Sequence, residues 1–97
     1  MKEMETKIVL GIDGNSIIVA RTIGPCQKEE IARFELDELV DLIQYRYATP
    51  WNSGKDALEK LFYILNEIFA IYSVNPEIKK EDAIKNIRFR IHENINK

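Results

Sequence analysis

The feature that most constrains this chain is a run of apolar residues at helical spacing in its second half. Over 53–73 they recur at steps of three and four, and they are Leu58, Leu61, Phe62, Leu65, Ile68, Phe69 and Tyr72. Ile64 and Ile71 widen this apolar face to about half of the helix circumference, whereas a helix with one neighbour typically shows a stripe about 100° wide. We therefore predict a long central helix over 53–73 that contacts several other elements.

The chain has 97 residues, which is enough for one hydrophobic core, so we expect a single domain over 1–97. Its composition is 45% hydrophobic and 31% charged, which is too apolar for a disordered chain. The formal charge of −2 gives no overall attraction to nucleic acid or to an anionic membrane. We therefore expect a small folded protein whose binding properties depend on local patches.

Two segments rich in β-branched residues, 7–12 and 17–23, precede this helix, and the sequence Asp-Gly-Asn-Ser separates them. These residue types favour a tight hairpin turn. A two-residue loop at Gly14 and Asn15 sets the register. The facing pairs are then Ile12 with Ile17, Leu10 with Val19, Val9 with Ala20 and Gly11 with Ile18. Both faces of the hairpin are fairly apolar, so we expect a further element or a partner to cover the second face.

The next segment, 30–36, fits a strand better than a helix. On a helix, Ile31 and Phe34 fall away from the stripe that follows, whereas on a strand Ala32, Phe34 and Leu36 share one face. We predict a β meander over 7–36, with Asp37 capping a helix over 37–47. The apolar stripe expected on that helix consists of Leu36, Leu39, Val40, Ile43 and Tyr47.

The C-terminal segment, 80–95, has two interpretations. Four isoleucines, Ile84, Ile87, Ile91 and Ile95, lie at helical spacing, while Ile87, Phe89 and Ile91 alternate as in a strand. We favour the helix because all four isoleucines fit it. Three strands followed by three helices predict an α+β fold, in which helices at 37–47, 53–73 and 80–95 pack on one face of an antiparallel sheet.

An aromatic cluster near the end of the first predicted helix is the candidate partner-binding site. It consists of Tyr45, Arg46, Tyr47 and Trp51. Aromatic rings and arginine dominate protein interface hot spots, and aromatic rings also stack on unpaired bases. The alternative is that Tyr47 and Trp51 cover the end of the central helix, which is the commoner use of aromatic residues.

The only local excess of positive charge lies in the C-terminal segment. The candidate nucleic-acid contacts there are Lys79, Lys80, Lys85, Arg88 and Arg90. Such residues could bind phosphates, but Glu81, Asp82 and Glu93 lie among them, as in an ordinary solvated helix face. Nucleic-acid binding is therefore an alternative hypothesis.

The segment Gly11-Ile12-Asp13-Gly14-Asn15 resembles the first-strand segment of two superfamilies. In actin-like sugar kinases and ATPases a similar strand-turn-strand holds phosphate, and in ribonuclease H-like nucleases a first-strand aspartate binds metal. The resemblance implies phosphoryl transfer, or metal-dependent phosphodiester hydrolysis centred on Asp13. Turn chemistry alone also explains these residues, and actin-like enzymes need two larger lobes than this chain can build. The nuclease-like reading is thus a remote alternative.

Other chemistry finds little support in the sequence. Cys26 and His92 are the single cysteine and histidine, and the sequence has no Walker-type phosphate loop, paired metal motif or nucleophile elbow. We expect no enzyme activity, no cofactor and no metal. The amino terminus does not read as a secretory signal, charges interrupt the longest apolar run, and the lone cysteine fits a reducing compartment, so we expect a cytoplasmic protein that does not enter membranes.

Excess apolar surface is the best functional indication in the sequence. Both hairpin faces and half of the central helix are apolar, in a chain too short to bury all of that surface. We expect a small non-enzymatic interaction or regulatory protein that binds itself as a homodimer or binds another protein.

Overall fold

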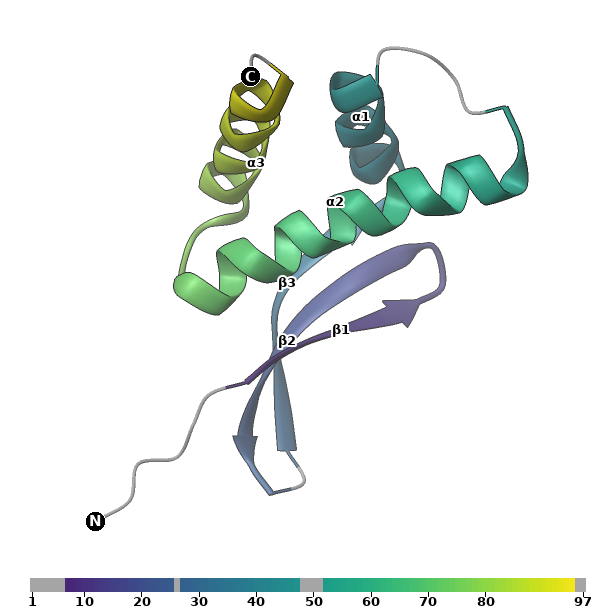
Figure 1. Ribbon diagram of the computed structural model, residues 1–97. Helices are drawn as coiled ribbons and strands as arrows, with labels where there is room; N and C mark the ends of the chain where they lie inside the picture. Colours follow the sequence, from purple (N-terminus) through teal and green to yellow (C-terminus); the bar gives the residue numbers. More distant parts are fainter. Residues whose placement is uncertain (1–6, 26, 48–51, 96–97) are drawn as a thin grey trace.

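A computed structural model describes residues 7–25, 27–47 and 52–95. Its elements are β1 (Ile8–Asp13), β2 (Ser16–Gly24), β3 (Gln27–Glu35), α1 (Leu36–Tyr47), α2 (Gly54–Val74) and α3 (Lys80–Ile95). Figure 1 shows the three helices on one side of the sheet, with α2 crossing between the strands and the other two helices. This is the predicted α+β architecture with a long central helix.

The sheet has the order β1-β2-β3 and is antiparallel throughout. The β1–β2 register is the predicted one, with Leu10 opposite Val19 and Ile12 opposite Ile17. Gly14 has a positive φ of 62°, a conformation that glycine adopts without steric cost, and this closes the two-residue turn. The hairpin register therefore follows from the turn.

The third strand is confirmed, and it contains a bulge. Val19 pairs with Ala32 but Ala20 pairs with Glu30, so Ile31 is an extra residue on β3. Phe34 is fully buried opposite Ile17. The predicted strand face of Ala32, Phe34 and Leu36 is interrupted because the helix begins at Leu36.

The face of the sheet away from the helices carries the apolar side chains of Val9, Ile18 and Ala20 together with polar contacts. Arg33 donates to Asp13 at 3.1 Å, and Ser16 Oγ donates to Glu35 Oε1 at 2.8 Å. Among the described elements none packs on this face in Figure 1, and Ile18 there is half-buried. The expectation of a covering element is therefore not met by α1, α2 or α3.

Helix α1 begins one residue earlier than predicted, and Asp37 is not its cap. Glu35 occupies the capping position because the strand continues to that residue, and its N–H donates to Glu38 Oε1 at 2.9 Å. A glutamate three residues into a helix commonly reaches back in this way. Leu42, rather than the exposed Leu36, completes the buried stripe with Leu39 and Ile43.

Helix α2 begins at a well-formed cap and ends at Asn75. The Ser53 side chain accepts from Asp56 N at 3.1 Å, and Asp56 Oδ2 accepts from Asn52 N at 3.0 Å. The bond from the Asn52 N–H lowers the pKa of the Asp56 carboxyl, and a salt bridge from Lys60 at 3.1 Å lowers it further. The buried apolar residues of α2 are Ile64, Ile68, Ile71 and Tyr72. The helix contacts α1, α3 and β1, as a central helix should.

Helix α3 confirms the helical interpretation of the C-terminal segment. Ile87 and Ile91 are fully buried, whereas Phe89 between them is 63% exposed. A strand interpretation would have placed all three residues on one face, so it is wrong.

Within the described residues, no helix is both long and apolar enough to cross a membrane.

Candidate interaction surface

The predicted aromatic cluster mainly joins helices to one another. The Arg46 guanidinium lies 4.9 Å from the Tyr47 ring centre and 5.3 Å from that of Tyr63 on α2. The ammonium of Lys60, a residue of α2, also lies 4.9 Å from the centre of the Tyr47 ring. Cation–π contacts of this kind stabilise the packing of α1 on α2. Tyr45 instead lies near Arg88 of α3, at 5.6 Å. The structure thus separates Tyr45 from Arg46 and Tyr47, and Trp51 lies outside the described residues.

The predicted basic patch is also divided. Lys80 Nζ donates to Glu38 Oε1 and to Arg33 O, each at 2.9 Å, and so holds α3 against α1 and β3. Arg90 forms an ion pair with Glu67 of α2, and this contact raises the pKa of the arginine. Lys79 and Lys85 are exposed. Arg88, three residues after Lys85 on α3, is exposed as well.

Asp13 lies at the end of β1 with its carboxylate against Arg33, at 3.1 Å. The Asp13 carboxylate therefore forms an ion pair with a side chain of the protein itself. Across the described part of the chain, no group of three or more His, Cys, Asp or Glu side chains is placed to hold a metal ion. Cys26 lies outside the described residues, and His92 is an exposed residue of α3.

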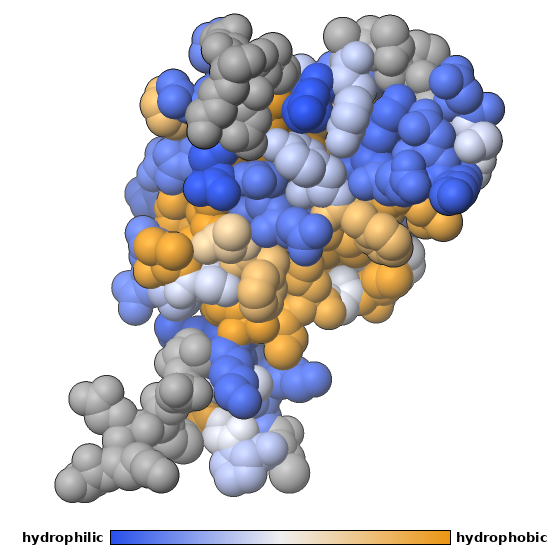
Figure 2. Space-filling model, viewed as in Figure 1, coloured by the Kyte–Doolittle hydropathy of each residue, from blue (hydrophilic) through white to orange (hydrophobic). Residues whose placement is uncertain are grey.

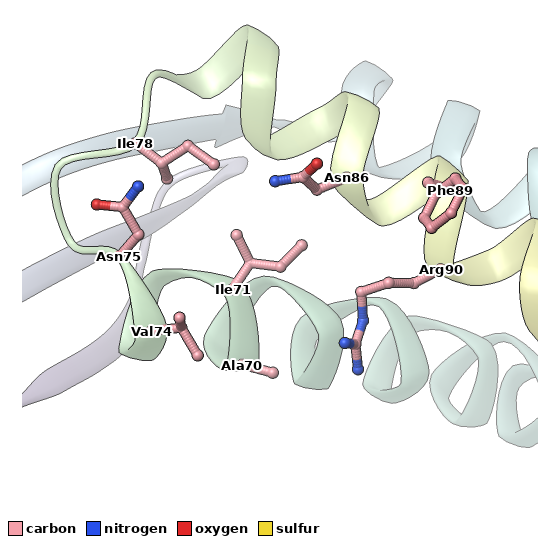
Figure 3. A pocket seen from close by; sticks show the side chains of 8 residues that line it. All are labelled: Ala70, Ile71, Val74, Asn75, Ile78, Asn86, Phe89 and Arg90. Atoms are coloured by element: carbon pink, nitrogen blue, oxygen red, sulfur yellow. The ribbon is translucent and has the colours of Figure 1, made fainter.

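A groove of about 450 Å³ opens between the C-terminal half of α2 and α3. Figure 3 shows Ile71 and Ile78 directed into it, while Arg90 reaches from α3 toward α2. The remaining lining residues are Ala70, Val74, Asn75, Asn86 and Phe89. Its lining is mainly apolar, and Asn75, Asn86 and Arg90 are its polar members.

Part of the apolar arc of α2 lies outside the core, and the sequence pattern alone does not indicate which part. Leu58, Phe62 and Phe69 are 54%, 57% and 43% exposed, and Leu65 between them is half-buried. Steps of four, three and four residues place them in one stripe along α2. A monomer in water would seldom leave two phenylalanines of one helix exposed in this way.

β1, which contacts α2, carries a further exposed apolar side chain. Ile12 is 80% exposed, and alternation along the strand places it on the same face as Ile8 and Leu10, the face that the helices cover. Figure 2 shows a band of apolar side chains across the middle of the molecule, at the level of α2 and the strands below it. We call Ile12, Leu58, Phe62, Leu65 and Phe69 the α2–β1 apolar surface.

The two edges of the sheet differ in chemistry. β3 carries many charged side chains and a bulge, both of which discourage pairing with another strand. β1 has the sequence Ile-Val-Leu-Gly-Ile-Asp, so its single charge lies at its end. Among the described strands, only β2 pairs with β1. Within the described residues, the outer edge of β1 therefore has no strand partner and carries no charge before Asp13.

The fold and these features define a small α+β protein in which a three-stranded antiparallel sheet is layered by three helices around α2. No family model, no curated protein and no solved structure matches the chain. The geometry of the chain itself must therefore support any functional proposal.

Proposed function

We propose that this protein acts by protein–protein binding, as a homodimer formed through the α2–β1 apolar surface. The exposure of Phe62 and Phe69 on one stripe of the central helix is the observation that carries this proposal. The proposal makes the protein an interaction or regulatory protein rather than an enzyme.

The hydrophobic effect supplies the driving force for this association. Burying a fully exposed leucine or phenylalanine side chain contributes about 1.5–3 kcal/mol, and a half-exposed one contributes roughly half of that. The stripe offers several such side chains, and a dimer buries each of them twice. Aromatic residues at the centre of an interface also tend to act as hot spots.

A second copy of the chain is the partner that the stripe fits best. When two α2 helices cross antiparallel, Leu58 of one lies against Phe69 of the other, and Phe62 lies against Leu65. A symmetric interface requires this kind of self-complementarity, in which one patch faces its own copy. The spacing of the four residues therefore favours a homodimer over a chemically different partner.

The test is the mass of Phe62→Glu in solution. We expect the wild type to be a dimer at micromolar concentration and the variant to be a monomer, with its dissociation constant raised about 100-fold or more. Sedimentation or light scattering measures this change. Phe89→Glu is the matched control, because Phe89 is as exposed as Phe62 but lies on α3. A monomeric wild type, or equal masses for Phe62→Glu and wild type, would contradict the proposal.

Nucleic-acid binding through the C-terminal segment receives less support. Lys80 and Arg90 are held in ion pairs with Glu38 and Glu67, which leaves their charge partly neutralised. Phosphate binding by these two residues would have to displace these contacts. We therefore keep the homodimer as the proposed function.

A further inference from the structure

The backbone of β1 carries hydrogen-bonding groups that the described chain leaves without a strand partner. In an antiparallel hairpin, alternate residues direct their N–H and C=O groups toward the neighbouring strand. Thr22 N donates to Lys7 O at 3.0 Å, so the odd-numbered residues of β1 face β2. The even-numbered residues Ile8, Leu10 and Ile12 therefore direct their backbone groups to the open edge of the sheet.

We propose that β1 pairs antiparallel with β1 of a second copy, about a two-fold axis at Leu10, to give one continuous sheet across the dimer. This inference rests on the proposed homodimer and specifies its geometry. Leu10 then faces Leu10 of the second copy, and Ile8 faces Ile12. At each end of the paired strands, the strongly exposed Ile12 of one copy thereby gains Ile8 of the other copy as an apolar neighbour.

The charges at the ends of β1 favour this register. Pairing about Leu10 places Lys7 of one copy opposite Asp13 of the other, twice in the dimer. Lys7 is exposed, and the Asp13 side chain is 60% exposed beside Arg33. Opposite charges directly across two strands are favourable, and a shift by two residues in either direction separates them.

The position of α2 is compatible with the same axis. Figure 1 shows β1 running beneath α2, and the two elements are in contact. Residues directly opposite across two strands lie on the same face, so both copies keep their helices on one side of the shared sheet. A single two-fold axis can then place β1 against β1 and the exposed stripe of α2 against its copy.

Disulfide trapping between single-cysteine variants tests both the pairing and its register. The proposed register places Val9 of one copy opposite Gly11 of the other, at a non-hydrogen-bonded pair where Cα atoms lie about 4.5 Å apart. This separation suits a disulfide, whereas diagonal neighbours about 7–8 Å apart do not. A side chain at Gly11 meets no atom within 4 Å, so a cysteine fits there.

The experiment oxidises Val9→Cys and Gly11→Cys, each in a Cys26→Ser background, alone and mixed. We expect the mixture to give a Val9→Cys/Gly11→Cys heterodimer, at a yield about 10-fold above the disulfide dimer of either variant alone. Mass spectrometry identifies the two linked chains, and light scattering on each reduced sample reports its oligomeric state. Val74→Cys, an exposed position at the end of α2, is the control for random collision.

Each other result overturns a separate claim. A disulfide dimer from Val9→Cys alone, or from Gly11→Cys alone, would establish a different register. Reduced dimers that form no disulfide above the Val74→Cys level would refute β1 pairing while the homodimer stands. A monomeric wild type would refute both.

Hydrogen exchange on the unmodified protein provides a second measurement. The Leu10 and Ile12 amides point away from β2, so they should exchange slowly in the dimer and at least about 10-fold faster in Phe62→Glu. The Val9 and Gly11 amides, which face β2, should be protected in both proteins. Equal exchange of the Leu10 amide in a dimeric wild type and a monomeric variant would overturn the pairing.

Discussion

At the scale of single residues, Ile87 and Phe89 of α3 lie two positions apart in opposite environments. Ile87 is fully buried, and Phe89 is largely exposed at the rim of the groove beside α2. We expect Ile87→Ala to lower the free energy of unfolding by about 2–5 kcal/mol, because it leaves a cavity in the core. Phe89→Ala, the larger truncation, should change it by less than about 0.5 kcal/mol. Urea unfolding of both variants measures the difference, and equal losses would contradict the helical phase of this segment.

At the scale of elements, Glu38 connects three of them. Burial acts to raise the pKa of its carboxyl, but the Glu35 N–H and the Lys80 ammonium together hold that pKa below its usual value of 4.5. Lys80 also donates to the Arg33 carbonyl. This group of contacts fixes the turn from β3 into α1 and holds the start of α3 against it.

A lowered pKa makes the contribution of Glu38 dependent on pH. Its stabilisation is present above pH 4.5, the usual value, and is lost as the pH falls through the lower pKa of the folded protein. We expect Glu38→Gln to be less stable than the wild type at pH 7, with the gap closing as the pH is lowered past that point. Urea unfolding at a series of pH values measures the gap, with Glu93→Gln as an exposed control on α3. A gap of constant size would contradict this role.

The prediction of elements from sequence succeeded where local chemistry decides the structure. The turn at Gly14 set the β1–β2 register, and the four-isoleucine spacing identified α3 as a helix. It failed where one element meets the next. Asp37 was expected to cap α1, but the strand continues to Glu35 and the longer Glu38 side chain supplies the bond.

The candidate surface could be predicted only in part. The apolar arc of α2 was visibly too wide for one neighbour, which indicated that some of it would stay exposed. The sequence could not specify that Ile64 and Ile68 lie inside and Phe62 and Phe69 outside, because the orientation of α2 is fixed by packing against β1, α1 and α3. The Tyr45–Tyr47 cluster was selected for its composition, but its arginine and lysine contacts serve the α1–α2 packing.

At the scale of the whole molecule, folding and association should be coupled. A dimer binds its own folded partner, so dilution shifts the equilibrium toward the unfolded chain. We expect the Tm of the wild type to rise by about 3 °C or more for each tenfold increase in concentration, as mass action requires for a dimer of this size. The Tm of Phe62→Glu should not depend on concentration. Calorimetry at several concentrations measures both, and a constant wild-type Tm would contradict the coupling.

The difference between the two sheet edges limits how large an assembly can become. β3 is bulged at Ile31, bears charged side chains of both signs and contacts α1, and these features discourage pairing with a further strand. If only the β1 edge accepts another strand, each chain can pair once. The resulting dimer then has no free β1 edge to which a third copy could add. In the proposed homodimer both β1 edges are used by the pair, so we expect a closed dimer instead of a filament.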